Sequence, residues 1–120
     1  MNRRLYALGR LPKGQKNKTE QAYEDQYLKP CLHAGEILWY RFEGIKLRLA
    51  DNTFLTVDYA VLRRDGLLEM VDVKGGPRVF TEDARVKMKV AAETYPFMFS
   101  VVYPVSKKDG GGWKKECIGE

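Results

Sequence analysis

Apolar and polar residues alternate along this chain in two periods, and each period predicts a different kind of element. A period near 3.6 predicts one helix over residues 18–29, capped by Asn17 or Thr19 and ended by Pro30, and a second helix over residues 81–95. Runs typical of strands lie between and after these helices, at residues 37–42, 45–49, 54–62, 67–74 and 97–103.

The order of these elements predicts the class of fold. We expect a helix, a group of antiparallel strands, a helix and a strand, and the step from residue 74 to residue 97 is a strand–helix–strand crossover with parallel pairing. The prediction is therefore an α/β protein with a mixed central sheet flanked by helices.

The most informative stretch is residues 54–74, where charged side chains end an apolar stripe. Successive residues of a strand face opposite sides of the sheet, so Leu68, Met70, Asp72 and Lys74 share one face. A carboxylate and an ammonium group on such a face are costly unless something pairs with them. A hard divalent cation and a phosphate group would compensate for this cost.

The turn at residues 63–66 determines which residue lies opposite Asp72. If Gly66 takes the left-handed position of a three-residue loop, Arg63 faces Leu67, and Asp58 then faces Asp72 on the same side of the sheet. Two carboxylates at that spacing repel, so one is protonated or both hold a metal ion. A two-residue turn would place Asp58 on the other face, and the two acids would then be ordinary charges at strand ends.

Composition and charge limit the class of protein. With 120 residues, 44% hydrophobic and 31% charged, the chain forms one globular domain. A net charge of +5 and a pI near 9.2 favour an anionic partner, with nucleic acid ahead of membrane. No apolar run approaches a membrane span or a secretory signal, and Cys31, Cys117 and the single His33 match no zinc pattern. We therefore expect a cytoplasmic protein with free thiols.

Basic residues gather at the two ends of the chain. We expect a basic arm over residues 1–16, which includes Arg3 and Arg4, and a basic, glycine-rich tail over residues 106–120, which includes Lys107 and Lys108. Lysines beside an aromatic residue can hold phosphates and stack on a base. Solvated, unstructured tails explain the same composition. The core then spans residues 17–105.

These residues together resemble a known superfamily. A helix with Glu20, a strand with Asp58, the triplet Asp72-Val73-Lys74 and a basic helix resemble the PD-(D/E)XK nucleases. Within that superfamily, segments 17–20, 36–40 and 83–87 look similar to small phage endonucleases related to the endonuclease I type of Holliday-junction resolvase. The resemblance covers residues 17–103. Val57 stands where the superfamily name expects proline, a position that shapes backbone rather than chemistry.

The resemblance implies a restriction-endonuclease-like fold and a Mg²⁺-dependent endodeoxyribonuclease, with Mn²⁺ as a substitute metal. In such a site, Asp58, Asp72 and the carbonyl of Val73 ligate the ion, and Glu20 completes the acidic cluster, directly or through water. Lys74 orients the attacking water or stabilises developing charge. Arg85 and Lys89, four residues apart on the second helix, would bind phosphate, although a solvated helix edge explains them equally well.

The implied substrate is DNA, and a branched substrate such as a Holliday junction would call for a homodimer with two sites. Two other functions stay open. The chain could be a DNA-binding protein that keeps the nuclease fold without turnover, or a phage protein that acts by binding a host protein in the cytoplasm of the host cell.

Overall fold

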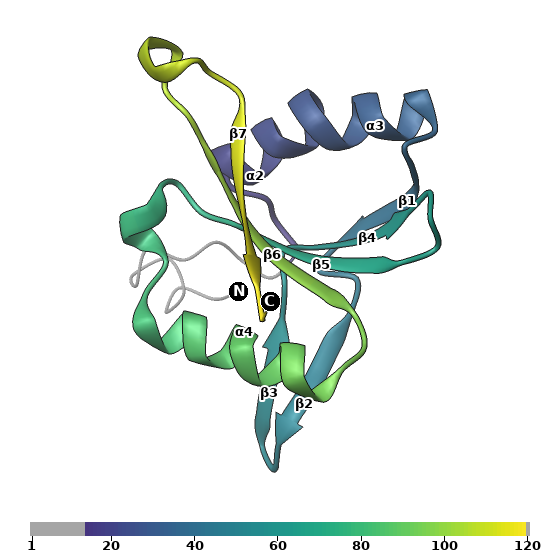
Figure 1. Cartoon of the computed structure of the whole chain (residues 1–120), viewed down its shortest axis with the longest axis vertical. Coiled ribbons are helices and arrows are strands. Elements are labelled where there is room, and N and C mark those ends of the chain that lie inside the picture. Colours follow the sequence, from purple (N-terminus) through teal and green to yellow (C-terminus); the bar gives the residue numbers. More distant parts are fainter. Residues whose placement is uncertain (1–13, 120) are drawn as a thin grey trace.

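The computed structural model describes residues 14–119, and its helices cover the two faces of a mixed sheet (Figure 1). The helical elements are α2 (Lys18–Tyr23), the π-helix η1 (Glu24–Leu28), α3 (Lys29–Ala34), the 3₁₀ turn η2 (Pro77–Val79), α4 (Glu82–Thr94) and the 3₁₀ turn η3 (Lys107–Asp109). The strands are β1 (Ile37–Phe42), β2 (Lys46–Ala50), β3 (Thr53–Thr56), β4 (Tyr59–Arg63), β5 (Leu68–Val73), β6 (Met98–Pro104) and β7 (Trp113–Ile118).

Five of the strands form the central sheet in the order β1-β4-β5-β6-β7, and β2 and β3 form a second sheet of two strands. Only β5 and β6 run parallel, and the other neighbours in the central sheet are antiparallel. The predicted α/β class, with a mixed central sheet and a parallel crossover through α4, is confirmed.

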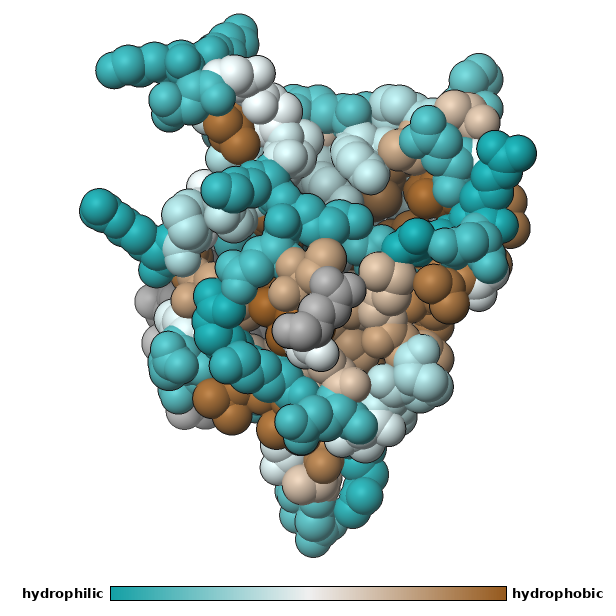
Figure 2. Space-filling view, in the orientation of Figure 1, coloured by the Kyte–Doolittle hydropathy of each residue, from teal (hydrophilic) through white to brown (hydrophobic). Residues whose placement is uncertain are grey.

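Each face of the sheet has its own core. One core packs α4, through Met88 and Ala91, and the β2–β3 hairpin against Met70 and Val101. The other packs the α2–α3 segment, through Tyr23 and Leu28, against residues of β4, β5 and β6. The surface over these cores is mixed, with hydrophobic patches between hydrophilic side chains (Figure 2). Within residues 14–119, no helix is long and apolar enough to cross a membrane.

The first helix runs beyond the predicted stop at Pro30, and that boundary was wrong. Asn17 caps its start as expected, but the helical path continues to Ala34 and ends at Gly35, which has φ of 77°. The π-helical segment explains the continuation, because the Lys29 amide bonds back to the Glu24 carbonyl, five residues earlier. This shift of register accommodates a proline, which has no N–H and clashes with the preceding turn of a regular α-helix.

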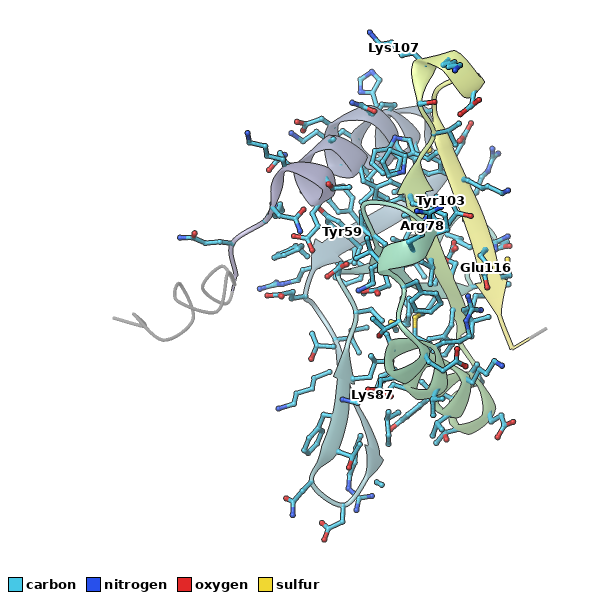
Figure 3. All side chains as sticks on the ribbon, turned by 90° about the vertical axis from the view of Figure 1, so that its left-hand side faces the viewer. Tyr59, Arg78, Lys87, Tyr103, Lys107 and Glu116 are labelled. Carbon is cyan, nitrogen blue, oxygen red and sulfur yellow. The ribbon has the colours of Figure 1, made fainter. Side chains whose placement is uncertain are left out.

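Two strand predictions also need correction. The run that leads to Asp58 is not one strand, because β3 pairs with β2 beneath α4 while β4 belongs to the central sheet. The segment after residue 105 is not a free tail, because β7 pairs with β6 from Pro104↔Trp113 to Phe99↔Ile118. Figure 3 shows Lys107 at the tip of this β6–β7 hairpin and Glu116 further along β7.

Candidate active site

The predicted turn between β4 and β5 is confirmed, and it brings two acids together. Gly66 has φ of 87°, its amide bonds to the Arg63 carbonyl, and the Arg63 amide bonds to the Leu67 carbonyl. Tyr59 pairs with Val71, so the next residues along the two strands, Asp58 and Asp72, lie opposite each other. The geometry that the three-residue loop predicts is therefore the one that the chain adopts.

Burial and repulsion perturb the ionisation of this acidic pair. Burial of the Asp58 carboxyl group, and next the charge of Asp72, raise the pKa of Asp58 from 3.8 to about 9. The hydrogen bond that Asp58 Oδ2 accepts from the Val73 amide, 2.7 Å long, acts in the opposite direction but is the smaller effect. Without a cation, the pair therefore holds one proton at neutral pH.

Lys74 completes the stripe as the alternation predicts. Its Nζ lies 3.0 Å from Asp72 Oδ2, and its side chain is 26% exposed. Burial alone would lower the pKa of Lys74, but the carboxylates of Asp72, Asp58 and Glu20 raise it overall. The ammonium group stays charged and partly open to solvent beside the two acids, where it can bind an anion.

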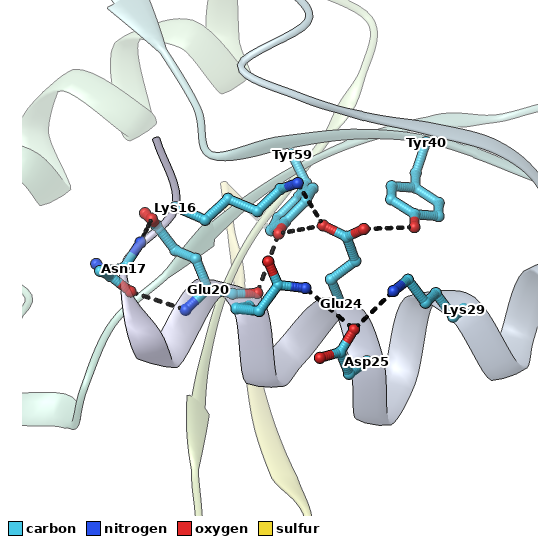
Figure 4. Close-up of polar contacts among 9 residues, drawn as sticks. Lys16, Asn17, Glu20, Glu24, Asp25, Lys29, Tyr40 and Tyr59 are labelled. Carbon is cyan, nitrogen blue, oxygen red and sulfur yellow. Dashed lines mark hydrogen bonds and ion pairs between the residues drawn. The ribbon is translucent and has the colours of Figure 1, made fainter. Parts of the chain in front are cut away.

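The charge of Glu20 contributes to the raised pKa of Asp58. The Glu20 carboxylate itself binds the start of its own helix (Figure 4). Its Oε1 accepts a hydrogen bond from the Asn17 amide at 2.8 Å, and the Asn17 side chain accepts one from the Glu20 amide. This pair is a capping box, which the spacing of three residues between Asn17 and Glu20 already indicates. The glutamate is therefore near the acidic pair, while its first interaction is with its own helix.

The donor set suits a hard divalent cation. No three His, Cys, Asp or Glu side chains within residues 14–119 gather closely enough to hold a metal ion by themselves. Mg²⁺, however, needs only one or two carboxylates, because it keeps several waters. The Val73 amide points to Asp58, and the carbonyl of the same residue in an extended strand points to that same side. Asp58, Asp72 and this carbonyl thus fit the ion.

A polar cluster around the Glu24 carboxylate was not predicted from the sequence (Figure 4). The buried Glu24 carboxylate accepts hydrogen bonds from the Tyr40 and Tyr59 hydroxyls. It also forms an ion pair with Lys16, whose Nζ lies 3.0 Å from Glu24 Oε1. Burial alone would raise the pKa of Glu24, but these three donors lower it overall. The Tyr59 hydroxyl also donates to the Glu20 carbonyl at 3.0 Å, so this cluster ties α2 to the strand that follows Asp58. The nearest sequence signal was the position of Glu24, one turn after Glu20.

The expected phosphate-binding residues fall into three groups. Arg85 already has a partner, because its guanidinium binds the Glu116 carboxylate of β7 and lies over the Phe80 ring. Lys89 is exposed beside this pair, and Lys107 and Lys108 are exposed in the η3 turn. Arg3 and Arg4 lie outside the described residues. Among the expected residues that lie within the described part of the chain, Lys89, Lys107 and Lys108 are therefore open to a phosphate, and Arg85 is not.

No protein-family model matches this chain, and the searches of curated proteins and of solved structures returned no match either. Any function therefore has to be argued from the residues and their geometry.

Proposed function

We propose that the protein is a metal-dependent DNA endonuclease that hydrolyses phosphodiester bonds. The observation that carries the proposal is the Asp58–Asp72 pair with Lys74 on the same face. Burial and repulsion hold the pKa of Asp58 near 9, which marks an acidic site that the one ammonium group of Lys74 does not neutralise. Buried, strongly perturbed carboxylates beside a charged lysine are typical of functional sites rather than of ordinary strand ends.

Each residue has a stated task in this proposal. Asp58, Asp72 and the Val73 carbonyl would hold Mg²⁺ or Mn²⁺, and Glu20 would complete the acidic cluster, directly or through water. The ion would supply a nucleophile at neutral pH and neutralise charge on the phosphate. Lys74, 3.0 Å from Asp72, donates to the phosphate oxygen or to the attacking water as negative charge develops. The Val73 amide keeps Asp58 oriented toward its partner.

The fold supports the assignment only at the level of topology. A mixed sheet in which the acid-bearing hairpin β4–β5 neighbours a parallel strand β6, with helices on both faces, is compatible with a restriction-endonuclease-like core. We extend the proposal to this fold family and to the PD-(D/E)XK superfamily, with the core at residues 17–105. Residue 105 lies inside the β6–β7 hairpin, so the structural unit extends through β7.

The substrate in this proposal is branched DNA of the Holliday-junction type, and the active form is a homodimer. Resolving a four-way junction requires cuts on two strands, whereas one Asp58–Asp72 site cuts one strand at a time. A two-fold dimer supplies two sites in the required symmetric relation. The net charge of +5 supports binding to such a polyanion.

One experiment tests the chemistry directly. The protein is incubated with a labelled four-way junction and a matched linear duplex, in Mg²⁺, in Mn²⁺ or in EDTA. We expect cleavage that requires metal and favours the junction, from a species of dimeric mass in light scattering. The absence of cleavage in both metals would refute the nuclease, and salt-sensitive binding alone would then favour a non-catalytic DNA-binding protein. Equal cleavage of both substrates by a monomer would refute the branched substrate and the dimer.

A further inference from the structure

A groove lies between α2 and the β6–β7 hairpin, on the face of the sheet that the α2–α3 segment covers. Its volume is about 210 Å³, and its walls are formed by Lys18, Thr19, Ala22, Gln26, Pro104 and Trp113. Figure 1 shows the hairpin passing α2 and projecting beyond the sheet. The proposed chemistry uses none of these residues, so the groove has no role in it.

We propose that this groove binds one unpaired nucleotide of the DNA strand, with its base against the Trp113 indole. This inference deepens the proposed function, on which its choice of a nucleic-acid ligand rests. A base can stack on an aromatic ring whatever its sequence, and proteins that bind single strands combine such rings with basic residues.

Trp113 is held in place before any ligand arrives. Its Nε1–H donates a hydrogen bond to Gln26 Oε1 at 3.1 Å. Its ring packs edge-to-face against the Tyr23 ring, with 5.1 Å between the ring centroids. Pairing with Pro104 fixes its backbone at the start of β7. A fixed aromatic ring loses little freedom on binding, which favours its use as a stacking surface.

The charge around the groove complements a phosphate chain. Lys18 lies in its wall, while Lys107, Lys108 and Lys114 are exposed on the hairpin. None of these four lysines forms an ion pair with a carboxylate of residues 14–119. The acid nearest the hairpin tip, Asp109, accepts a hydrogen bond from the Ser106 hydroxyl. Figure 2 shows this tip as a hydrophilic projection, and Lys107 marks it in Figure 3.

The size of the groove indicates a single nucleotide rather than a duplex. A volume of about 210 Å³ is below that of ordinary small-molecule pockets and far too small for a double helix. The groove lies on the face of the sheet that α2 covers, where Trp113 packs against Tyr23, whereas alternation puts Asp72 on the opposite face with Met70. On β6, Pro104 lies only two residues, about 7 Å, beyond Val102, which pairs with Val73. A base bound in the groove is therefore reached around the end of these strands, not directly from the acidic pair.

Fluorescence titration in EDTA tests whether the groove binds an unpaired nucleotide, under conditions in which no metal-dependent cleavage occurs. The chain has two tryptophans, so a Trp39→Phe protein leaves Trp113 as the only indole. Oligo(dT) of eight nucleotides should quench this fluorescence, and a hairpin duplex of equal charge should quench it much less. In the same background, Ala22→Leu narrows the groove and should weaken oligo(dT) binding at least tenfold. Val86→Leu, on an exposed position of α4, is the matched control and should bind as the parent does.

A second groove variant, Thr19→Leu, keeps the test valid if Ala22→Leu perturbs the helix in circular dichroism. No quenching by oligo(dT), or equal oligo(dT) affinity in the folded groove variants and the control, would refute nucleotide binding in the groove. Metal-dependent cleavage by the wild-type protein would still support the nuclease in that case. If the groove variants weaken the quenching and no metal supports cleavage, nucleotide binding in the groove is supported and the nuclease activity is refuted.

Discussion

Replacing Asp58 by asparagine should stabilise the metal-free protein and remove most of its dependence on pH. Burial, followed by the charge of Asp72, raises the pKa of this carboxyl group from 3.8 in the unfolded chain to about 9 in the folded one. Between these values the folded state binds one proton that the unfolded state lacks. The stabilising effect is complete below pH 3.8 and is lost as the pH rises toward 9.

The magnitude follows from this one proton. Between the two pKa values, the free energy of unfolding should fall by about 1.4 kcal/mol for each unit of pH. Asparagine has the shape of the protonated acid, so it can still accept from the Val73 amide and donate toward Asp72. It takes up no proton on folding. At neutral pH, about three units above the unfolded pKa, Asp58→Asn should therefore stabilise the metal-free protein by up to about 4 kcal/mol.

Urea unfolding in EDTA, at several values between pH 5 and pH 8, measures the effect. Asp51→Asn is the control, because the Asp51 side chain is 94% exposed and the substitution removes the same charge. Added Mg²⁺ should stabilise the wild-type protein and leave Asp58→Asn unchanged. The reasoning is refuted if the wild-type protein and Asp58→Asn show the same slope with pH, or if Asp58→Asn is the less stable of the two at neutral pH.

Three further predictions concern the proposed reaction. Asp72→Asn should reduce cleavage by roughly 10²-fold or more while DNA affinity in EDTA stays equal or rises, because the lost charge holds the ion but repels phosphate; cleavage at the wild-type rate would show that the site is misassigned. Lys74→Ala should lose activity on a similar scale yet bind Mn²⁺ in calorimetry, since its ammonium acts on the phosphate or the water; a folded Lys74→Ala protein that no longer binds Mn²⁺ would contradict that role. Deleting residues 1–13 removes Arg3, Arg4, Arg10 and Lys13, and it should lower the slope of log affinity against log salt by up to about 3.6, at about 0.9 per phosphate contact. An unchanged slope would mean that the arm does not contact DNA.

The elements and the acidic pair could be predicted because their causes are local. Strand alternation places Asp72 and Lys74 on one face, and the left-handed Gly66 sets the register that brings Asp58 opposite Asp72. The cap at Asn17 and the one at Thr81 depend on side chains within three residues of the amides that they bind. Effects that act over a few residues can be read from the order of the residues alone.

Other features depend on partners far along the chain, and only the tertiary structure decided them. The helix passes Pro30 because a π-helical turn shifts its hydrogen bonds. Segment 113–118 is a strand because it pairs with the free edge of β6. Glu116 on that strand forms an ion pair with Arg85, so the Arg85 guanidinium is not free to bind a phosphate. The pKa of Asp58 near 9 likewise requires burial of its carboxyl group and the charge of Asp72 on the neighbouring strand. Local sequence sets which side of a strand a residue faces, but the burial and charge around that residue come from distant segments that meet only when the chain folds.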